Sequence, residues 1–197
     1  MNSIDSGSLD PLVELLIEAF WDDPWFSSLA ADGTRRRKIL QTLFGALVRY
    51  AHRHHAIAAT TSGDAVACWL PRDVPTFTTW GLLRAGIWRL PLLLGRDRMH
   101  RFMAHVEHVE ALRKRLQPTP HMYLALLAVA PRSQGTGVGG QLLESVLKQL
   151  DESATPFYLE THNPRNVPFY ERHGFALLGQ WPSPVDGIST WAMRRPP

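Results

Sequence analysis

The chain has 197 residues, of which 45% are hydrophobic and 20% charged, with 14 glycines, 15 prolines and one cysteine. This apolar content excludes a disordered protein, the scattered glycines and prolines exclude a collagen-like chain, and the lone Cys68 excludes an internal disulfide framework. The balance of 21 Lys and Arg against 18 Asp and Glu, +3 overall, is too mild to indicate nucleic-acid binding. We expect one domain over residues 1–197.

We expect no export signal in the first residues of this sequence. Residues 1–10 contain neither a basic residue nor an apolar run, and the most apolar stretch, Trp80–Leu94, is interrupted by Arg84 and Arg89. We therefore expect a cytoplasmic protein without membrane or nucleic-acid partners. The tightest basic run, Arg35–Lys38, is typical of the solvated start of a helix.

The first half of the chain predicts helices around one hairpin. Asp10-Pro11 is followed by apolar residues at helical spacing up to Phe20, and the same spacing recurs over Arg35–His52. The pattern then changes to two strands, at 56–61 and 65–70, with a turn at Ser62-Gly63-Asp64. Two further helices are predicted at 78–94 and 98–116.

The second half predicts a strand–helix–strand unit. Met122–Val129 is a continuous apolar strand, a glycine-rich loop follows, and apolar residues at helical spacing cover Val138–Leu150 before a second strand at Phe157–Thr161. A short helix near 167–173 and strands near 175–179 and 189–193 complete the chain.

The glycine-rich loop predicts an anion site. Its sequence is Gln134-Gly135-Thr136-Gly137-Val138-Gly139-Gly140, and glycines at a helix start let backbone N–H groups approach phosphate oxygens. The spacing also matches G-x-G-x-x-G with Glu160 twenty residues beyond, as in NAD(P)-dependent oxidoreductases. Against that interpretation, five residues separate strand from glycines, and too little chain follows Glu160. A P-loop is excluded because no Gly-Lys-Ser/Thr follows.

Two motifs together resemble the GNAT superfamily of N-acyltransferases. Gln134, Gly137 and Gly139 match the family pattern Gln/Arg-x-x-Gly-x-Gly/Ala, and Asn163-Pro-Arg-Asn-Val-Pro-Phe-Tyr-Glu-Arg-His-Gly-Phe175 matches its second motif. Residues 158–194 are most similar to puromycin N-acetyltransferase and its bacterial relatives. The resemblance implies an α/β fold with a mixed central sheet of about six or seven strands and helices on both faces. Residues 121–195 would form the cofactor-binding and catalytic half, and residues 1–120 mainly the acceptor side.

The resemblance also implies acetyl-CoA as co-substrate. Pantetheine would lie beside the strand at Leu127, Ala128 and Val129, with the Val129 N–H as oxyanion donor. The pyrophosphate would lie over the loop, and the second motif adds Asn166; the implied loop contacts are Gln134, Gly135, Thr136, Gly137, Val138, Gly139 and Gly140. Members of the family usually begin with a strand that precedes the first helix. In this sequence either Asn2–Ile4 forms a short strand of that kind, or the first edge of the sheet is missing.

Two residues are candidates for the proton transfers. The resemblance makes the Tyr170 hydroxyl the acid that protonates the departing sulfur. Without the motif, packing of Phe169 and Tyr170 in the core is the favoured explanation. Glu160 ends an apolar strand, where burial would raise its pKa toward that of a base. It could instead bind the cationic amine or pair with a nearby arginine, and two histidines, His121 and His162, are weaker alternatives as the base.

The acceptor and the assembly are less determined by the sequence. The tryptophans Trp21, Trp25, Trp80 and Trp88 suit a small-molecule amine carried on an apolar or aromatic body, although each also suits a core. Histidine clusters at 52–55 and 105–108 lack cysteine partners, so we expect no metal site. The function expected is direct transfer of acetyl to a primary amine, by a monomer or homodimer. The alternatives are the oxidoreductase and a non-catalytic acyl-CoA sensor.

Overall fold

The structure is a computed structural model that describes residues 9–70, 83–150 and 155–197. The helices are α1 (Leu9–Ala19), α2 (Pro24–Ser28), α3 (Gly33–Arg53), α5 (Leu90–Leu94), α6 (Arg96–Leu116), α7 (Val138–Leu150) and α8 (Val167–Arg172), with 3-10 turns η2 (Ile87–Arg89), η3 (Pro131–Ser133) and η5 (Pro164–Asn166). The strands are β1 (Ile57–Ala59), β2 (Ala65–Leu70), β3 (Met122–Val129), β4 (Phe157–Thr161), β5 (Ala176–Pro182) and β6 (Ser189–Arg195).

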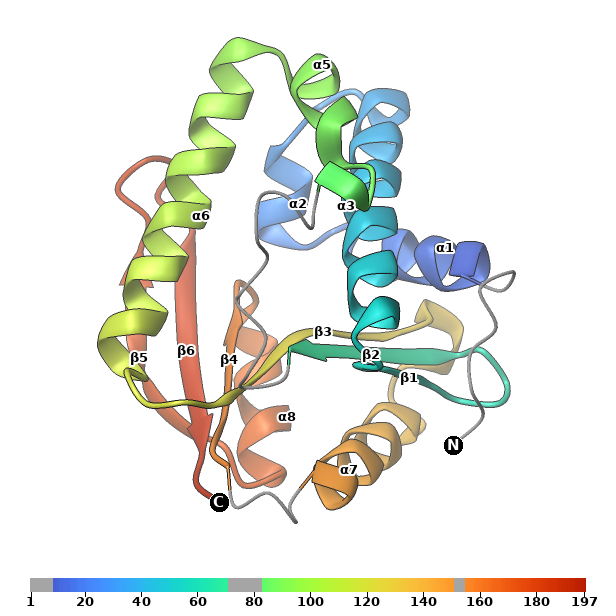
Figure 1. Ribbon diagram of the computed structural model, residues 1–197, viewed down its shortest axis with the longest axis vertical. Coiled ribbons are helices and arrows are strands. Elements are labelled where there is room, and N and C mark those ends of the chain that lie inside the picture. The colour runs from blue at the N-terminus through green and yellow to red at the C-terminus, as the bar shows by residue number, and fades with distance from the viewer. Residues whose placement is uncertain (1–8, 71–82, 151–154) are drawn as a thin grey trace.

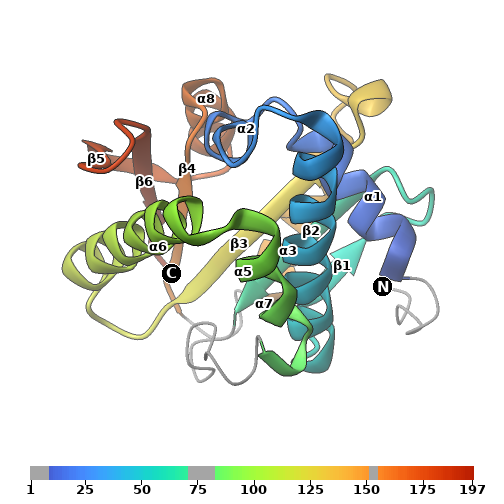
Figure 2. The same ribbon diagram turned by 90° about the horizontal axis from the view of Figure 1, so that it is seen from above.

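The strands form one sheet in the order β1-β2-β3-β4-β6-β5. All neighbours are antiparallel except β3 and β4, the strands joined by the α7 crossover, which run parallel. Helices α1, α3 and α6 lie on one face of the sheet and α7 and α8 on the other (Figures 1 and 2). The predicted α/β fold, a mixed sheet with helices on both faces, is confirmed.

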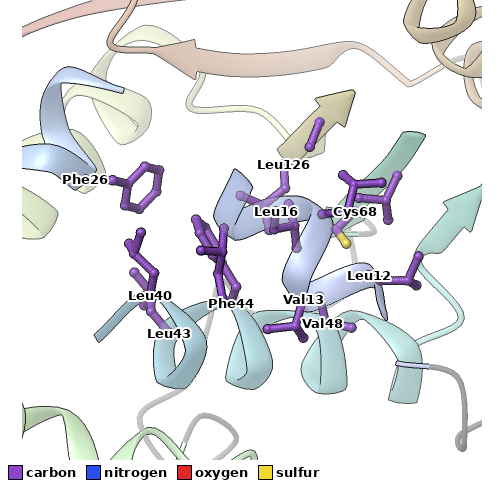
Figure 3. Close-up of a cluster of buried hydrophobic side chains, with 14 of the residues drawn as sticks. Leu12, Val13, Leu16, Phe26, Leu40, Leu43, Phe44, Val48, Cys68 and Leu126 are labelled. Atoms are coloured by element: carbon purple, nitrogen blue, oxygen red, sulfur yellow. The ribbon is translucent and has the colours of Figure 1, made fainter. Parts of the chain in front are cut away.

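Two hydrophobic cores fill the two faces. The helices α1 and α3 close the first core over β2 and β3, as Figure 3 shows for Leu12, Val13, Leu16, Leu43, Phe44, Val48, Cys68 and Leu126. The second core packs the apolar side of α7 and α8 against β3 and β4, through Leu142, Leu143, Val146, Leu147, Phe157, Leu159 and Tyr170. Successive side chains of a strand point to opposite faces, so β1, β2 and β3 contribute to both cores, whereas β4 and β6 contribute to the second.

The continuous helix predicted over 78–94 is wrong in its described part. Gly86 adopts φ +101°, a left-handed conformation that ends a helical turn, and the separate short helix α5 begins at Leu90, with Pro91 in its first turn. Sequence periodicity also missed α2. The Asp23 carboxylate caps that helix by accepting hydrogen bonds from the N–H groups of Trp25 (3.0 Å) and Phe26 (3.3 Å).

The basic run at the start of α3 is used within the fold. Arg35 donates to the Leu93 carbonyl (2.7 Å), the Arg36 guanidinium lies 4.1 Å from the Trp21 ring centroid, and Arg37 pairs with Glu14. The run therefore links α3 to the helices around it. No helix in the described ranges has the length and apolar content needed to cross a bilayer. The strand considered at Asn2–Ile4 lies outside the described residues.

Candidate active site

A gap in the sheet separates β3 from β4. The two strands pair only at Met122–Phe157 and Tyr123–Tyr158, and then diverge (Figure 1). The register of β3 against β2 also slips, with Cys68 opposite Leu126 but Trp69 opposite Leu124, so β3 bulges at its middle. Beyond Tyr123 no described strand pairs with this edge of β3, which leaves backbone groups open to a ligand.

The direction of these backbone groups follows from one hydrogen bond. The Ala130 N–H donates to the Asp64 carbonyl (2.8 Å) on the β2 side of the strand. Because N–H groups alternate along a strand, those of Val129 and Leu127 point toward the gap. The Gln134 side chain donates to the Val129 carbonyl at the same edge (3.2 Å). The predicted cofactor edge at residues 127–129 therefore faces the gap.

The four loop glycines serve two purposes. Gly135 and Gly137 have φ of +78° and +88°, and a Cβ at either would meet no atom within 4 Å, so the loop is open there. A Cβ on Gly139 would lie 2.7 Å from Val129 Cγ2, and one on Gly140 would lie 3.0 Å from His173 Nε2. The first pair therefore shapes the loop, whereas the second lets α7 approach its neighbours closely.

The loop presents the start of α7 to the gap. Thr136 braces it by donating from Oγ1 to the Ser133 carbonyl (2.7 Å), and the first N–H groups of a helix have no partner within that helix. Val138 begins this helix beside the open edge of β3. An anion could accept hydrogen bonds from these groups, as predicted from the sequence.

Glu160 lies on the face of β4 that α6 covers. Both its carboxylate oxygens are buried and neither has a hydrogen-bond partner of ordinary geometry. Burial raises the pKa of Glu160 to about 7, although Arg113 and the hydroxyls of Tyr123 and Tyr158 lower it in part. Arg113 pairs with Glu110, so its charge does not fully compensate Glu160. The carboxyl group can therefore exchange a proton near neutral pH.

Tyr170 lies on the opposite face of the sheet. It packs in the second core with Leu159, the β4 residue that alternates with Glu160, and its ring meets Phe169 and Phe175 edge-on. Burial raises the pKa of its hydroxyl. Asn166 is held at the end of β4 by donating to Thr161 Oγ1 (3.0 Å). Groups on opposite faces can reach one bound molecule only through a gap between strands.

The structure separates the predicted tryptophans. Trp25 lies on the α6 side of the sheet, where its ring contacts His105 and His162. Trp21 packs under Arg36, and Trp88, 54% exposed, lines a separate hollow of about 590 Å³ between α1, α3 and η2. Trp80 lies outside the described residues. Of Trp21, Trp25 and Trp88, Trp25 is thus the one that contacts histidines on the side of the sheet that carries Glu160.

Sequence patterns did not predict a chain of hydrogen-bonded side chains that lies on the same side of the sheet as Glu160. Asp186 Oδ2 lies 3.0 Å from His105 Nδ1, and His105 Nε2 lies 3.0 Å from His162 Nε2. The sequence indicates His162 as a possible base and His105 as part of a histidine cluster, but it does not predict their contact, because 57 residues separate them. The described residues contain no cluster of three or more metal-ligating side chains.

Comparison with known proteins agrees with this geometry. Residues 101–196 match the model of the acetyltransferase (GNAT) domain family. An uncharacterized N-acetyltransferase of Schizosaccharomyces pombe is 28% identical over 167 residues, covering 81% of this chain and 67% of the relative.

Solved structures share the whole architecture. One is a structure from Corynebacterium glutamicum, described as histone acetyltransferase HPA2 and related acetyltransferase, which is 27% identical in sequence. The match includes 98% of this chain and 93% of that chain, with a TM-score of 0.68. A polyamine N-acetyltransferase of Drosophila melanogaster, 12% identical, shares the fold with a TM-score of 0.62 over 98% and 97% of the two chains.

Proposed function

We propose that the protein transfers the acetyl group of acetyl-CoA to the primary amine of a small molecule, because residues 101–196 match the model of the acetyltransferase (GNAT) domain family. The observation that carries the proposal is the Glu160 carboxylate, which is buried beside the β3–β4 gap and whose charge is not fully compensated, because Arg113 also pairs with Glu110. An unpaired buried carboxylate is costly to keep, and a cationic amine would compensate it.

The residues around the gap fit acetyl-CoA. The open edge of β3 at Leu127 and Val129 offers N–H and carbonyl groups in the spacing of a strand, which suits the amides of pantetheine. The loop from Gln134 to Gly140 leaves open space at Gly135 and Gly137 beside the first N–H groups of α7, which suits the pyrophosphate. We assign cofactor binding to these two segments and to Asn166.

In this proposal bound acetyl-CoA supplies a thioester carbonyl that an uncharged amine attacks directly. Glu160 takes one proton from the arriving ammonium group and so exposes the nitrogen lone pair. The Val129 N–H donates to the carbonyl oxygen as negative charge develops there. Tyr170 donates its hydroxyl proton to the departing sulfur, and regains one from the nitrogen that has formed the amide. One proton remains, on Glu160, for release to water.

The acceptor class follows from the same face. Trp25 presents an aromatic surface on the α6 side of the sheet, and Glu160 presents a carboxylate there. A primary amine on an aromatic or apolar body matches both features. Puromycin and tryptamine sample this class, and agmatine and spermidine test primary amines on polycationic chains.

The test is turnover of acetyl-CoA with these four amines, followed by thiol release. We expect at least one amine to be acetylated, and Tyr170→Phe to reduce kcat by about 10²–10⁴-fold while the Kd for acetyl-CoA stays unchanged, because Phe preserves the ring packing. Leu177→Ala, an exposed residue of β5, serves as control. Binding of acetyl-CoA without turnover of any amine would indicate a sensor, and full activity of Tyr170→Phe would remove that residue from the mechanism.

A further inference from the structure

Buried polar atoms without partners gather on the face of the sheet that carries Glu160. Besides its two oxygens they include the Tyr158 hydroxyl and Thr190 Oγ1. Glu160 stands opposite Ala192 in the sheet, so Thr190, two residues before Ala192, shares its face. A polar ligand at this face would satisfy atoms that the described protein leaves unsatisfied.

The histidine chain lies next to these atoms. His162 directly follows β4 and is two residues beyond Glu160, while His105 projects from α6 and is fully buried. Asp186 closes the chain from the turn between β5 and β6. The chain thus ties together α6, the end of β4 and the β5–β6 turn.

The hydrogen-bonded chain of Asp186, His105 and His162 determines which ring nitrogens carry protons. The Asp186 carboxylate only accepts hydrogen bonds, so His105 Nδ1 carries the proton between them. Neutral His105 then has a lone pair on Nε2, which accepts a hydrogen bond from the Nε2–H of His162. His162 is left with a lone pair on Nδ1.

Packing holds both rings in this arrangement. The Trp25 ring stacks on His105, with centroids 4.7 Å apart and planes 18° apart, and lies 5.2 Å from the His162 centroid. Burial lowers the pKa of His105 and lowers that of His162 to about 3, with Asp186 opposing both shifts. A histidine with so low a pKa remains neutral at physiological pH and acts as a hydrogen-bond acceptor, not as a base.

We propose that His162 is a second residue that binds the acceptor amine, accepting an N–H hydrogen bond at Nδ1, and that His105 and Asp186 are positioning residues that set its tautomer. The proposal rests on the proposed function and adds a specificity rule to it. A primary amine that gives one proton to Glu160 still has an N–H for His162, and that contact orients the nitrogen lone pair. An amine without a spare N–H would lose the contact.

The first experiment reads the protons without turnover. In the full chain labelled with ¹⁵N-histidine, long-range ¹H–¹⁵N spectra should show His105 protonated at Nδ1 and His162 at Nε2. Tryptamine, agmatine or spermidine added without acetyl-CoA should shift the His162 Nδ1 resonance. A proton on His162 Nδ1 in the wild-type protein would overturn the proposal, even if amines are acetylated.

The second experiment uses kinetics with whichever of these amines the wild type acetylates. His162→Ala and His105→Phe, which keeps an aromatic ring against Trp25, should each raise the KM for the amine by about 3- to 10-fold, the worth of one hydrogen bond. The KM for acetyl-CoA and the pH at which activity rises should not change. His100→Phe, at an exposed histidine of α6, is the matched control and should leave both KM values unchanged.

The outcomes separate the two proposals. An unchanged amine KM in His162→Ala overturns the role of His162 and leaves the acetyltransferase proposal intact. An equal rise in both KM values in His105→Phe indicates a general structural effect and also overturns the positioning role. Absence of turnover with every amine overturns the proposed function itself, and this inference with it.

Discussion

Glu160 keeps both oxygens buried although Arg113 lies near it on α6. Because Arg113 also pairs with Glu110 and packs over Tyr123, its charge is shared, and burial remains the largest influence on the pKa of Glu160. The pKa is raised on folding from an ordinary value of 4.5 to about 7. The ionised carboxylate that a base requires therefore lowers the stability of the fold.

Glu160→Gln should separate activity from stability. The raised pKa means that the folded protein binds more protons than the unfolded chain between about pH 4.5 and pH 7, so stability falls across this window as pH rises. Gln should therefore increase the free energy of unfolding at pH 8 by up to about 3 kcal/mol, and by far less at pH 4.5. Urea denaturation at the two pH values measures this difference.

The same substitution should remove the rise in kcat/KM with pH that centres near 7, because the base no longer ionises. Glu107, an exposed residue of helix α6, provides the control. Glu107→Gln should change neither the free energy of unfolding nor the pH dependence of kcat/KM. An equal stability change at both pH values would show that the carboxylate is not the source of the effect.

At the scale of elements, Gly139 lets α7 pack closely against β3. Gly139 stands in the first turn of α7 directly over Val129, and Val129 belongs to the strand whose free edge faces the gap. The absence of a side chain at residue 139 therefore sets the distance between the helix start and the strand. The predicted anion site and the predicted pantetheine edge depend on the same contact.

Gly139→Ala should destabilise the protein by about 1–3 kcal/mol, because its Cβ would lie 2.7 Å from Val129 Cγ2. The double variant with Val129→Ala should recover part of this loss, which a double-mutant cycle in urea measures. Gly45→Ala, inside α3, is the control: its Cβ would meet the flexible end of Arg49, and Ala favours helix. Additive effects of the two changes at 139 and 129 would exclude the contact as the cause.

At the scale of the whole molecule, the sheet consists of two parts joined at β3 and β4. One part, β1 to β3, supports the first core, and the other, β4 to β6, carries Glu160 and the β5–β6 turn. Only two residue pairs connect the strands at the junction. A ligand bound between β3 and β4 would contact both parts and should stabilise the fold as a unit.

Acetyl-CoA at 100 times its Kd should therefore stabilise the fold by about 2.7 kcal/mol, which corresponds to a rise in Tm of roughly 5–10 °C. NAD at the same concentration should give no such rise. Gly137→Glu should abolish the acetyl-CoA effect by charge and steric conflict with phosphate. Gly63→Glu, at another open glycine with positive φ, should preserve it. Stabilisation by NAD in place of acetyl-CoA would restore the oxidoreductase interpretation.

The sequence by itself determined the order of most elements and the position of the glycine loop. Apolar spacing is a local property, and it predicted α3, α6, α7 and the strand–helix–strand unit close to their observed bounds. It failed where one residue overrides the pattern, as Gly86 does by interrupting the helix expected over 78–94. The family's second motif indicates Tyr170 as the acid, the end of an apolar strand indicates Glu160 as the base, and both roles remain predictions.

Only the tertiary structure decided what surrounds those residues. The burial that raises the pKa of Glu160 comes from α6, and the partners of His105 lie 57 and 81 residues away along the chain. Likewise, the sequence indicates all the tryptophans equally as residues of an acceptor pocket, but they occupy different places. Trp25 contacts His105, whereas Trp88 lines a separate hollow. The physical reason is that burial and hydrogen bonding depend on distance in space, which local periodicity does not specify.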